Sequence, residues 1–250
     1  MNISHIHLPD GVLPWSWWLL ADLLALVWLL VALRHEGRGR RSMRLPLLGA
    51  LGACMLLTMS VPLGPLPLHL NLTIVTGILA GPWLGFITVF LVNIMLSLLG
   101  HGGLTVVGLN SLLMGLEVAV GWWLFHRLFR NWSISWRACL APMLALLLSV
   151  SISFGVIGWS TGDWAASLPG SHAEAHRHGH ELAVHSAEGQ SYPETGLGAV
   201  LSDWGALGQT GIAALALLFG LGLLSESVAT LAVTRYIEQV RPELLRGETE

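Results

Sequence analysis

Long apolar runs separated by short polar segments dominate the chain. A membrane-spanning helix needs about 20 mainly apolar residues, because the hydrocarbon core is roughly 30 Å thick and each residue rises about 1.5 Å. A shorter apolar stretch, Leu70–Leu79, follows a proline-rich turn and ends at Gly81-Pro82-Trp83. Runs of the spanning kind lie at Pro14–Leu33, Pro46–Val61, Trp83–Leu99, Val106–Phe125, Ala138–Trp159 and Gly205–Thr234. The pattern predicts an all-α, polytopic membrane protein with six or seven spans.

The placement of arginines favours seven spans. Five arginines lie in the loop expected at Arg34–Arg44, three lie in Arg127–Arg137, and three follow from Arg235 onward. The positive-inside rule places such segments in the cytoplasm, and only seven spans put all three on one side. We therefore predict seven transmembrane helices, one of them short, with the N-terminus outside and the C-terminus cytoplasmic. Residues 1–250 are expected to form one membrane-embedded domain with a long outer loop at 160–203.

Composition excludes several classes of protein. Hydrophobic residues make up 54% of the chain and charged residues only 11%, against about 45–50% and about 25% in soluble domains. No lysine is present, and twelve arginines stand against fifteen acidic residues. A soluble globular enzyme, a disordered chain and a nucleic-acid binder with a basic face are therefore excluded. The two cysteines lie in or beside apolar runs and indicate no disulfide framework.

Histidines gather on one side of the predicted membrane. His35 and His126 lie beside arginines on the cytoplasmic side. Imidazole is a common ligand for nickel, cobalt, copper and zinc, so outer histidines suggest that a metal ion is captured before transit. Taken singly, His69 is also explained as an interfacial histidine, and His101 as a loop histidine bonded to backbone carbonyls. The nine outer histidines are His5, His7, His69, His101, His172, His176, His178, His180 and His185.

The outer loop contains five histidines in fourteen residues, from His172 to His185. We interpret it as a flexible, low-affinity metal collector; the alternative is a solvated loop whose histidines merely titrate. Within it, His180 and His185 resemble the metalloprotease motif HExxH but are five residues apart rather than four. Their side chains would leave the shared helix face, so the spacing argues against a protease.

An ordered set of short motifs carries a family resemblance. Leu8-Pro9-Asp10-Gly11-Val12-Leu13 follows His7, and His69 stands twelve residues before Gly81-Pro82-Trp83. Further on, Gly102-Gly-Leu-Thr-Val-Val-Gly-Leu-Asn110 precedes Met114-Gly115. Together these motifs resemble the CbiM/NikM family, the cobalt- and nickel-binding membrane subunits of energy-coupling factor (ECF) ABC transporters. The resemblance is clearest from residue 6 to residue 126.

The resemblance implies a seven-helix substrate-binding component, or permease, that delivers a divalent metal ion across the bacterial inner membrane. It implies as partners an ECF transmembrane coupling subunit and cytoplasmic ATPase subunits, with a small auxiliary membrane subunit as a further candidate. It also implies the ligands. In the family the chain begins Met-His, and the terminal amine, the next amide nitrogen, that histidine's ring and a later histidine hold the metal in near-square-planar geometry. By position, His7 and His69 match these two histidines.

This chain departs from the family pattern at its N-terminus, because five residues, Met1–His5, precede the matching place. Either the chain is processed or translated from a later start, or the site is rebuilt. In a rebuilt site, His5 replaces the lost amine nitrogen beside His7 and His69. His101 then serves as the fourth ligand or as a residue that supports one. A square-planar site favours nickel, and an imidazole-rich site favours cobalt or zinc. Co²⁺, Ni²⁺ and Zn²⁺ are thus candidate substrates, and no permanently bound cofactor is expected.

Three acidic residues, Asp22, Glu117 and Glu226, fall within predicted spans. An ionised group at the centre of a spanning helix costs at least about 2.5 kcal/mol, so these side chains must face protein or water. One interpretation makes Asp22 and Glu117, both near mid-depth, steps on a path for a cation or a proton. The other makes the acids hydrogen-bonded packing residues. Asn93 and Asn110 are predicted to form hydrogen bonds between helices.

The leading hypothesis is a metal-binding subunit of an ECF-type uptake transporter. The chain contains no Walker A sequence, GxxxxGK[ST], and no lysine to complete one, so it cannot hydrolyse ATP in the P-loop manner. That agrees with a subunit energised by partners, and equally with a stand-alone metal carrier or metal sensor. A membrane metalloenzyme is less favoured, because the histidines lie in turns and a loop rather than in pairs on one helix face. We expect no enzymatic activity.

Overall fold

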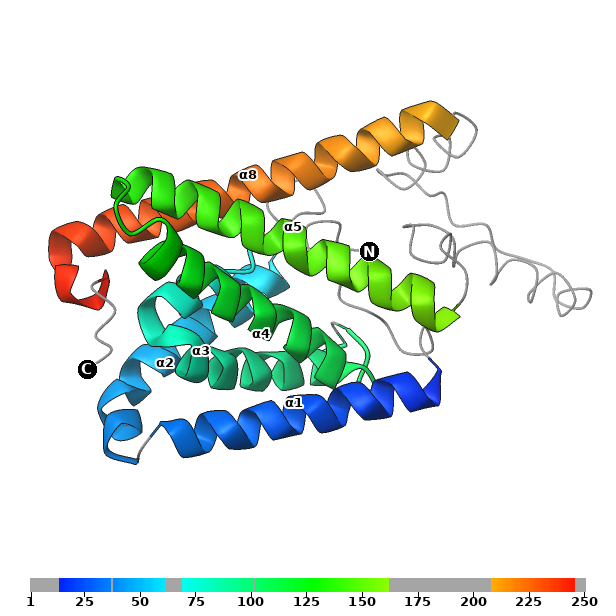
Figure 1. Cartoon of the computed structure of the whole chain (residues 1–250), viewed down its shortest axis with the longest axis horizontal. Helices are drawn as coiled ribbons and strands as arrows, with labels where there is room; N and C mark the ends of the chain where they lie inside the picture. The colour runs from blue at the N-terminus through cyan, green and yellow to red at the C-terminus, as the bar shows by residue number, and fades with distance from the viewer. Residues whose placement is uncertain (1–13, 37, 62–68, 101, 162–207, 246–250) are drawn as a thin grey trace, which may run out of the picture.

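The computed structural model describes residues 14–36, 38–61, 69–100, 102–161 and 208–245, and all regular structure in these ranges is helical. The predicted all-α fold class is confirmed. The main helices lie around two central helices, Thr73–Leu98 and Val107–Trp123, as Figure 1 shows. In chain order the elements are α1 (Trp15–His35), α2 (Arg38–Ser60), α3 (Thr73–Leu98), α4 (Val107–Trp123), a π-helix (Leu124–Leu128), α5 (Ile134–Thr161), α8 (Gly208–Val240) and a 3₁₀ helix (Pro242–Leu245).

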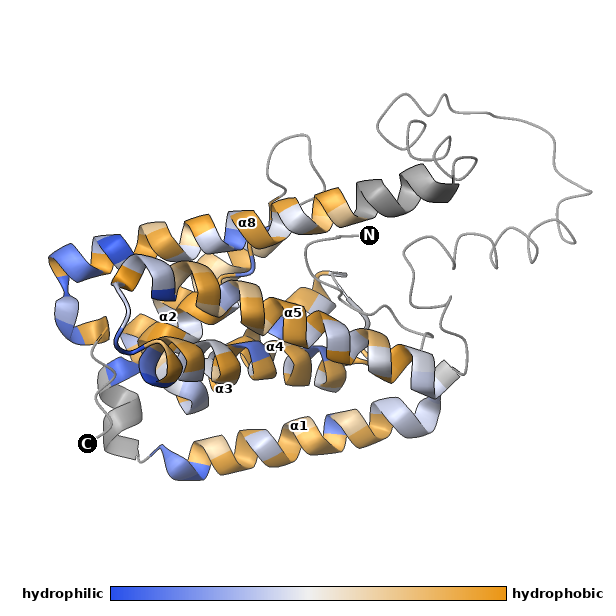
Figure 2. Cartoon of the chain, turned by 45° about the horizontal axis from the view of Figure 1, so that its top comes forward, coloured by the Kyte–Doolittle hydropathy of each residue, from blue (hydrophilic) through white to orange (hydrophobic). Residues whose placement is uncertain are grey.

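Five helices in the described ranges are long and apolar enough to cross a membrane: Trp15–His35, Thr73–Leu98, Val107–Leu128, Ile134–Ser160 and Ala216–Val240. Helix α2 adds a shorter apolar stretch, Arg44–Ser60. Figure 2 shows hydrophobic residues along the bodies of these helices. The polytopic architecture is confirmed, whereas the count of seven spans stays a prediction. The predicted third and fourth spans lie together in α3.

Helix α3 is two helices joined at a sharp turn. Gly81 has φ 86° and ψ 172°, a backbone conformation that is essentially restricted to glycine. A Cβ atom on Gly85 would lie only 3.5 Å from the Cα of Gly77, although eight residues of continuous helix would separate them by about 12 Å. The chain therefore reverses at Gly81, and residues 73–80 pack against residues 82–98. This reversal separates the short predicted span from the one after it.

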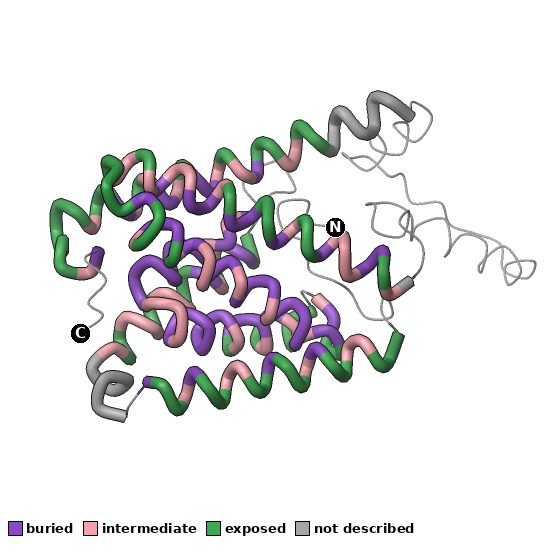
Figure 3. Tube along the Cα trace, in the orientation of Figure 1, coloured by how far each residue is buried: buried purple, intermediate pink, exposed green. Residues whose placement is uncertain are grey.

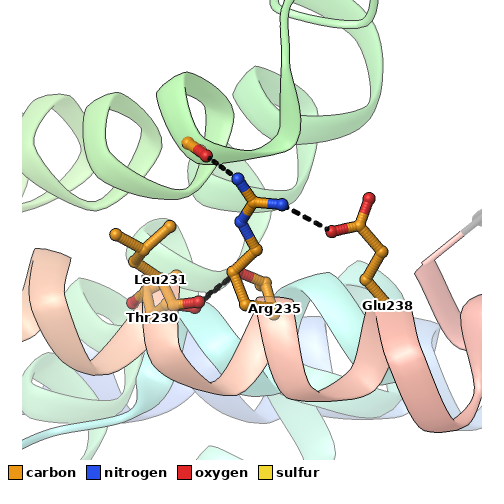
Figure 4. A network of polar contacts seen from close by, with 6 residues as sticks. Thr230, Leu231, Arg235 and Glu238 are labelled. Atoms are coloured by element: carbon orange, nitrogen blue, oxygen red, sulfur yellow. Dashed lines mark hydrogen bonds and ion pairs between the residues drawn. The ribbon is translucent and has the colours of Figure 1, made fainter.

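The arginine-bearing helix ends gather at one end of the bundle. In Figure 1 the end of α1, the start of α2, the connection from α4 to α5 and the end of α8 all lie at the left. At this end Arg235 of α8 donates to the Ser135 hydroxyl of α5 at 2.7 Å and pairs with Glu238 at 3.2 Å (Figure 4). The grouping agrees with the predicted placement of the three arginine segments on one side. Which side faces the cytoplasm stays a prediction.

One expectation about this end was wrong. The segment Arg34–Arg44 was expected to be a loop, but Arg34 and His35 end α1, and α2 already begins at Arg38. Helices extend beyond the apolar runs because backbone hydrogen bonding continues into the polar interface.

The core lies between α3 and α4, which Figure 3 shows as largely buried, while α1 and α8 are exposed along much of their length. Small residues allow the close approach: a Cβ atom on Gly77 would lie 2.6 Å from the carbonyl oxygen of Val118. Asn93 of α3 donates to the Ser111 hydroxyl of α4 at 3.2 Å, which confirms the interhelical role predicted for Asn93. The exposed apolar faces of α1 and α8 suit contact with lipid.

Candidate metal centre

His69 lies on a short non-helical segment that enters the core just before α3. Its side chain is only 9% exposed, and that of Asn71 is 1% exposed. Leu72, which caps the start of α3, adopts the left-handed conformation with φ 55° and ψ 12°. The segment therefore brings a buried imidazole into the bundle on irregular backbone. Buried irregular backbone within a membrane protein is tolerated only where protein or a water-filled cavity satisfies it.

Asn71 connects this segment to two other helices. Its backbone N–H donates to the Glu226 carboxylate of α8, and its side-chain Nδ2 donates to Oε2 of Glu117 in α4 at 3.0 Å. The hydroxyl of Thr73 donates to Oδ1 of Asn71. Glu117 and Glu226 are 4% and 2% exposed. We call Asn71, Glu117 and Glu226 the carboxylate clamp. Asn71 was missed by sequence reasoning, and its only signal was a polar side chain in an apolar run two residues after His69.

Asp22 has a different environment. Its Oδ1 accepts a hydrogen bond from the backbone N–H of Gly108 at 2.8 Å, in the first turn of α4, where N–H groups have no partner within the helix. A carboxylate there also benefits from the positive end of the helix dipole. Glu117 lies nine residues further along α4, about 13 Å by helical rise. The structure thus brings Glu117 together with Glu226 rather than with Asp22, and α1 and α4 meet at Gly108.

The other predicted ligands lie outside the described residues. These are His5, His7, His101, His172, His176, His178, His180 and His185. Within the described ranges, no three His, Cys, Asp or Glu side chains form a group that could hold a metal ion. Among the predicted ligands, His69 alone therefore has surroundings that the structure describes.

Five helices long and apolar enough to cross a membrane make this a multi-pass membrane protein, and ionisable groups buried inside such a bundle mark a functional site. The chain belongs to the CbiM family: residues 7–244 match the family model described as the cobalt uptake substrate-specific transmembrane region. Membership confirms the resemblance drawn from the motifs. The family is one of transport proteins located in membranes, so the chain is a transport component rather than an enzyme.

Curated relatives carry names of the same kind. The chain is 30% identical over 186 residues to a cobalt transport protein CbiM of Sorangium cellulosum, covering 66% of this chain and 82% of the relative. It is 28% identical over 182 residues to a cobalt transport protein CbiM of Anoxybacillus flavithermus, covering 67% and 72% of the two chains. These matches extend the likeness well beyond the N-terminal motifs.

Two crystal structures share the fold. One, of a transition metal transporter, has a TM-score of 0.66 and 19% identity, covering 94% of this chain and 93% of that chain. The other, of a truncated transition metal transporter, has a TM-score of 0.65 and 18% identity, covering 94% and 99%. At such low identity the likeness establishes the fold alone.

Proposed function

We propose that this chain is the metal-binding membrane subunit for uptake of Co²⁺, with Ni²⁺ and Zn²⁺ as competing substrates. The observation that carries the proposal is the burial of His69 on irregular backbone inside the bundle, at the position where the family resemblance requires a ligand. The match to a cobalt uptake family and the two relatives named for cobalt transport support cobalt as the substrate.

The ligands of the proposed site are His7 and His69, joined by His5 and His101. Nitrogen donors suit cobalt, nickel and zinc because these ions are of borderline softness. An imidazole binds as the neutral ring, so metal and proton compete for the same nitrogen. The histidines between His172 and His185 are proposed to collect metal loosely. They raise the local metal concentration without building a fixed geometry.

Transport is proposed to be energised by ECF partners: a transmembrane coupling subunit, cytoplasmic ATPase subunits and a small auxiliary membrane subunit. The chain lacks the lysine that a P-loop requires, which agrees with a subunit energised by partner ATPases. A protein of Methanocorpusculum labreanum, proposed to be a fused cobalt transport protein CbiMQ, supports a partner. It is 38% identical over 116 residues, and the match covers 19% of that longer chain.

The test is the metal content and affinity of His69→Ala and His7→Ala, purified without an affinity tag. Each substitution removes one nitrogen that only water can replace, so we expect Co²⁺ binding to weaken by more than about 100-fold. Native protein should also lose metal below about pH 6, because protons then compete for imidazole nitrogens, whose reference pKa is about 6.5. Mass spectrometry and calorimetry measure both effects.

The matched control is His35→Ala, which removes an exposed imidazole stacked on Trp83 at the arginine-rich end of α1. It should bind Co²⁺ as the native protein does. His5→Ala should weaken binding only if His5 replaces the family's terminal amine. Stoichiometric, tight binding by His69→Ala at neutral pH would refute the site.

A further inference from the structure

The segment that carries His69 reaches deep into the bundle. It contacts Glu117, which is ten residues from the start of α4, about 15 Å by helical rise, and Glu226, near the middle of α8. Irregular backbone at this depth requires hydrogen-bond partners from the protein. The carboxylate clamp supplies them from two helices that are far apart in the sequence.

The conformation of the segment is imposed by its surroundings. Leu72 has a positive φ of 55°, and the left-handed region costs a residue with a Cβ atom roughly 1–2 kcal/mol. Hydrogen bonds hold the chain on both sides of Leu72. The Thr76 N–H donates to the Leu72 carbonyl oxygen at 2.9 Å, and the Thr73 hydroxyl donates to Asn71. Such a conformation persists only where neighbouring contacts over-determine it.

We propose that Asn71 is a positioning residue for metal binding: through the carboxylate clamp it fixes the segment on which His69 is presented to the ion. Only Leu70 separates the two residues, so a shift of Asn71 moves the backbone of His69. This proposal rests on the proposed role of His69 as a ligand. It adds a residue that touches no metal and acts through hydrogen bonds to Glu117 and Glu226.

The role of Glu117 as a hydrogen-bond acceptor can be separated from its negative charge. In Glu117→Gln an amide oxygen still accepts from Nδ2 of Asn71, while the charge is gone. In Asn71→Asp the negative charge increases, while the donor to Glu117 is lost. The double variant N71D/E117Q exchanges amide and carboxylate, restoring both the hydrogen bond, now donated in the opposite direction, and the original charge.

The experiment compares these three full-length variants with native protein by Co²⁺ affinity and by the visible absorption spectrum of bound Co²⁺, which reports ligand geometry. Positioning predicts that N71D weakens binding by about 10- to 100-fold, the range for lost outer-sphere support of a ligand, and changes the spectrum. E117Q should keep the native spectrum, and N71D/E117Q should regain it. Thermal unfolding of the metal-free variants, measured in parallel, identifies any loss of fold.

Three outcomes would overturn the proposal. The first is a native spectrum and affinity in N71D. The second is a loss in E117Q as large as that in N71D, which would assign the effect to charge. The third is no recovery in N71D/E117Q, provided that it unfolds at the native temperature. If N71D does not fold, Glu226→Leu and Glu226→Gln replace it, because only the glutamine keeps an acceptor for the Asn71 backbone N–H. His69→Ala in the same series tests the ligand independently.

Discussion

Gly108 sets the closest approach between α1 and α4. A Cβ atom at this position would lie 2.3 Å from Oδ1 and 2.4 Å from Cα of Asp22. The backbone of α1 thus occupies the space that any side chain at residue 108 would need. The same contact delivers the Asp22 carboxylate to the N-terminus of α4. A single glycine and a single acid therefore fix how these two helices meet.

Gly108→Ala should separate the two helices. Because the clash involves backbone atoms of α1, no rotamer change can relieve it, and we expect a destabilisation of about 1–3 kcal/mol. Thermal unfolding of the protein in detergent measures the effect. Gly155→Ala is the matched control: it lies in α5, and a Cβ atom there would meet nothing within 4 Å. Equal unfolding temperatures for the two variants would contradict this account of the contact.

The acids and asparagines show which side chains sequence can assign. Asp22, Glu117 and Glu226 stand out because charge is rare inside spans. Asn71 does not stand out in this way, because an asparagine in an apolar run is most simply interpreted as an interhelical hydrogen-bond donor, as Asn93 proves to be. Asn71 is separated from Glu117 by 46 residues and from Glu226 by 155. Only the packing of α3, α4 and α8 reveals that they meet.

At the level of elements, the hairpin within α3 decides the architecture. Residues 73–80 form a half-helix of about 12 Å, too short to cross the bilayer without the irregular segment that precedes it. Gly81 reverses the chain, and Pro82 follows where a missing N–H does no harm at the start of a helix. The half-helix carries Ile74, Val75, Ile78 and Leu79 into a cluster with Phe125 and Leu245. Packing, rather than length, holds it in place.

Gly81→Ala should disrupt this hairpin. Its dihedral angles are essentially restricted to glycine, so we expect a cost of about 1–3 kcal/mol from backbone strain alone. Beyond the adjoining backbone, no atom lies within 4 Å of the added methyl group, and so the effect cannot come from a clash with another part of the structure. The unfolding temperature and the Co²⁺ affinity should both fall, since the hairpin anchors the segment that bears His69. Gly49→Ala in α2, also in open space, should lower neither quantity, because alanine favours a helix more than glycine does; a similar loss there would undermine the interpretation.

Most elements could be predicted from the sequence, because the apolar runs at Pro14–Leu33 and Ala138–Trp159 closely match α1 and α5. The ends could not. Hydropathy marks where a helix meets lipid, whereas the helix itself continues into the interface, so α2 begins at Arg38 rather than at Pro46. The Gly81-Pro82 break was visible in the sequence, but the close packing of its two halves depends on the approach of Gly77 to Gly85 and of both to Val118 in α4.

On the scale of the whole molecule, burial and charge are organised along different directions. Burial falls from the central pair α3 and α4 toward α1 and α8 on the outside (Figure 3). The most hydrophilic residues gather instead at one end of the helices (Figure 2), the end that carries the arginine segments. The first direction suits a protein surrounded by lipid, and the second suits one held in a fixed orientation by the membrane.

The orientation in the membrane is a prediction that reporter fusions can check. The connection from α4 to α5 contains Asn131 and lies at the same end as the start of α2 and the end of α8 (Figure 1). Because arginines gather at this end and short basic segments are retained in the cytoplasm, reporters fused after Arg44, Asn131 or Glu250 should all report cytoplasm. A reporter inserted near Gly189, in the loop expected outside, should report the opposite side.

The fusion at Asn131 is the most informative of the four. Residues 73–80 account for the difference between six and seven crossings: if they only dip into the membrane and return, every later connection changes sides. Asn131 would then lie outside together with Arg127, Arg130 and Arg137, against the charge rule. A cytoplasmic signal at both Arg44 and Asn131 requires an even number of crossings between them, and α2, the two halves of α3 and α4 supply four. An outside signal at Asn131 would reduce these to three and overturn the seven-span topology.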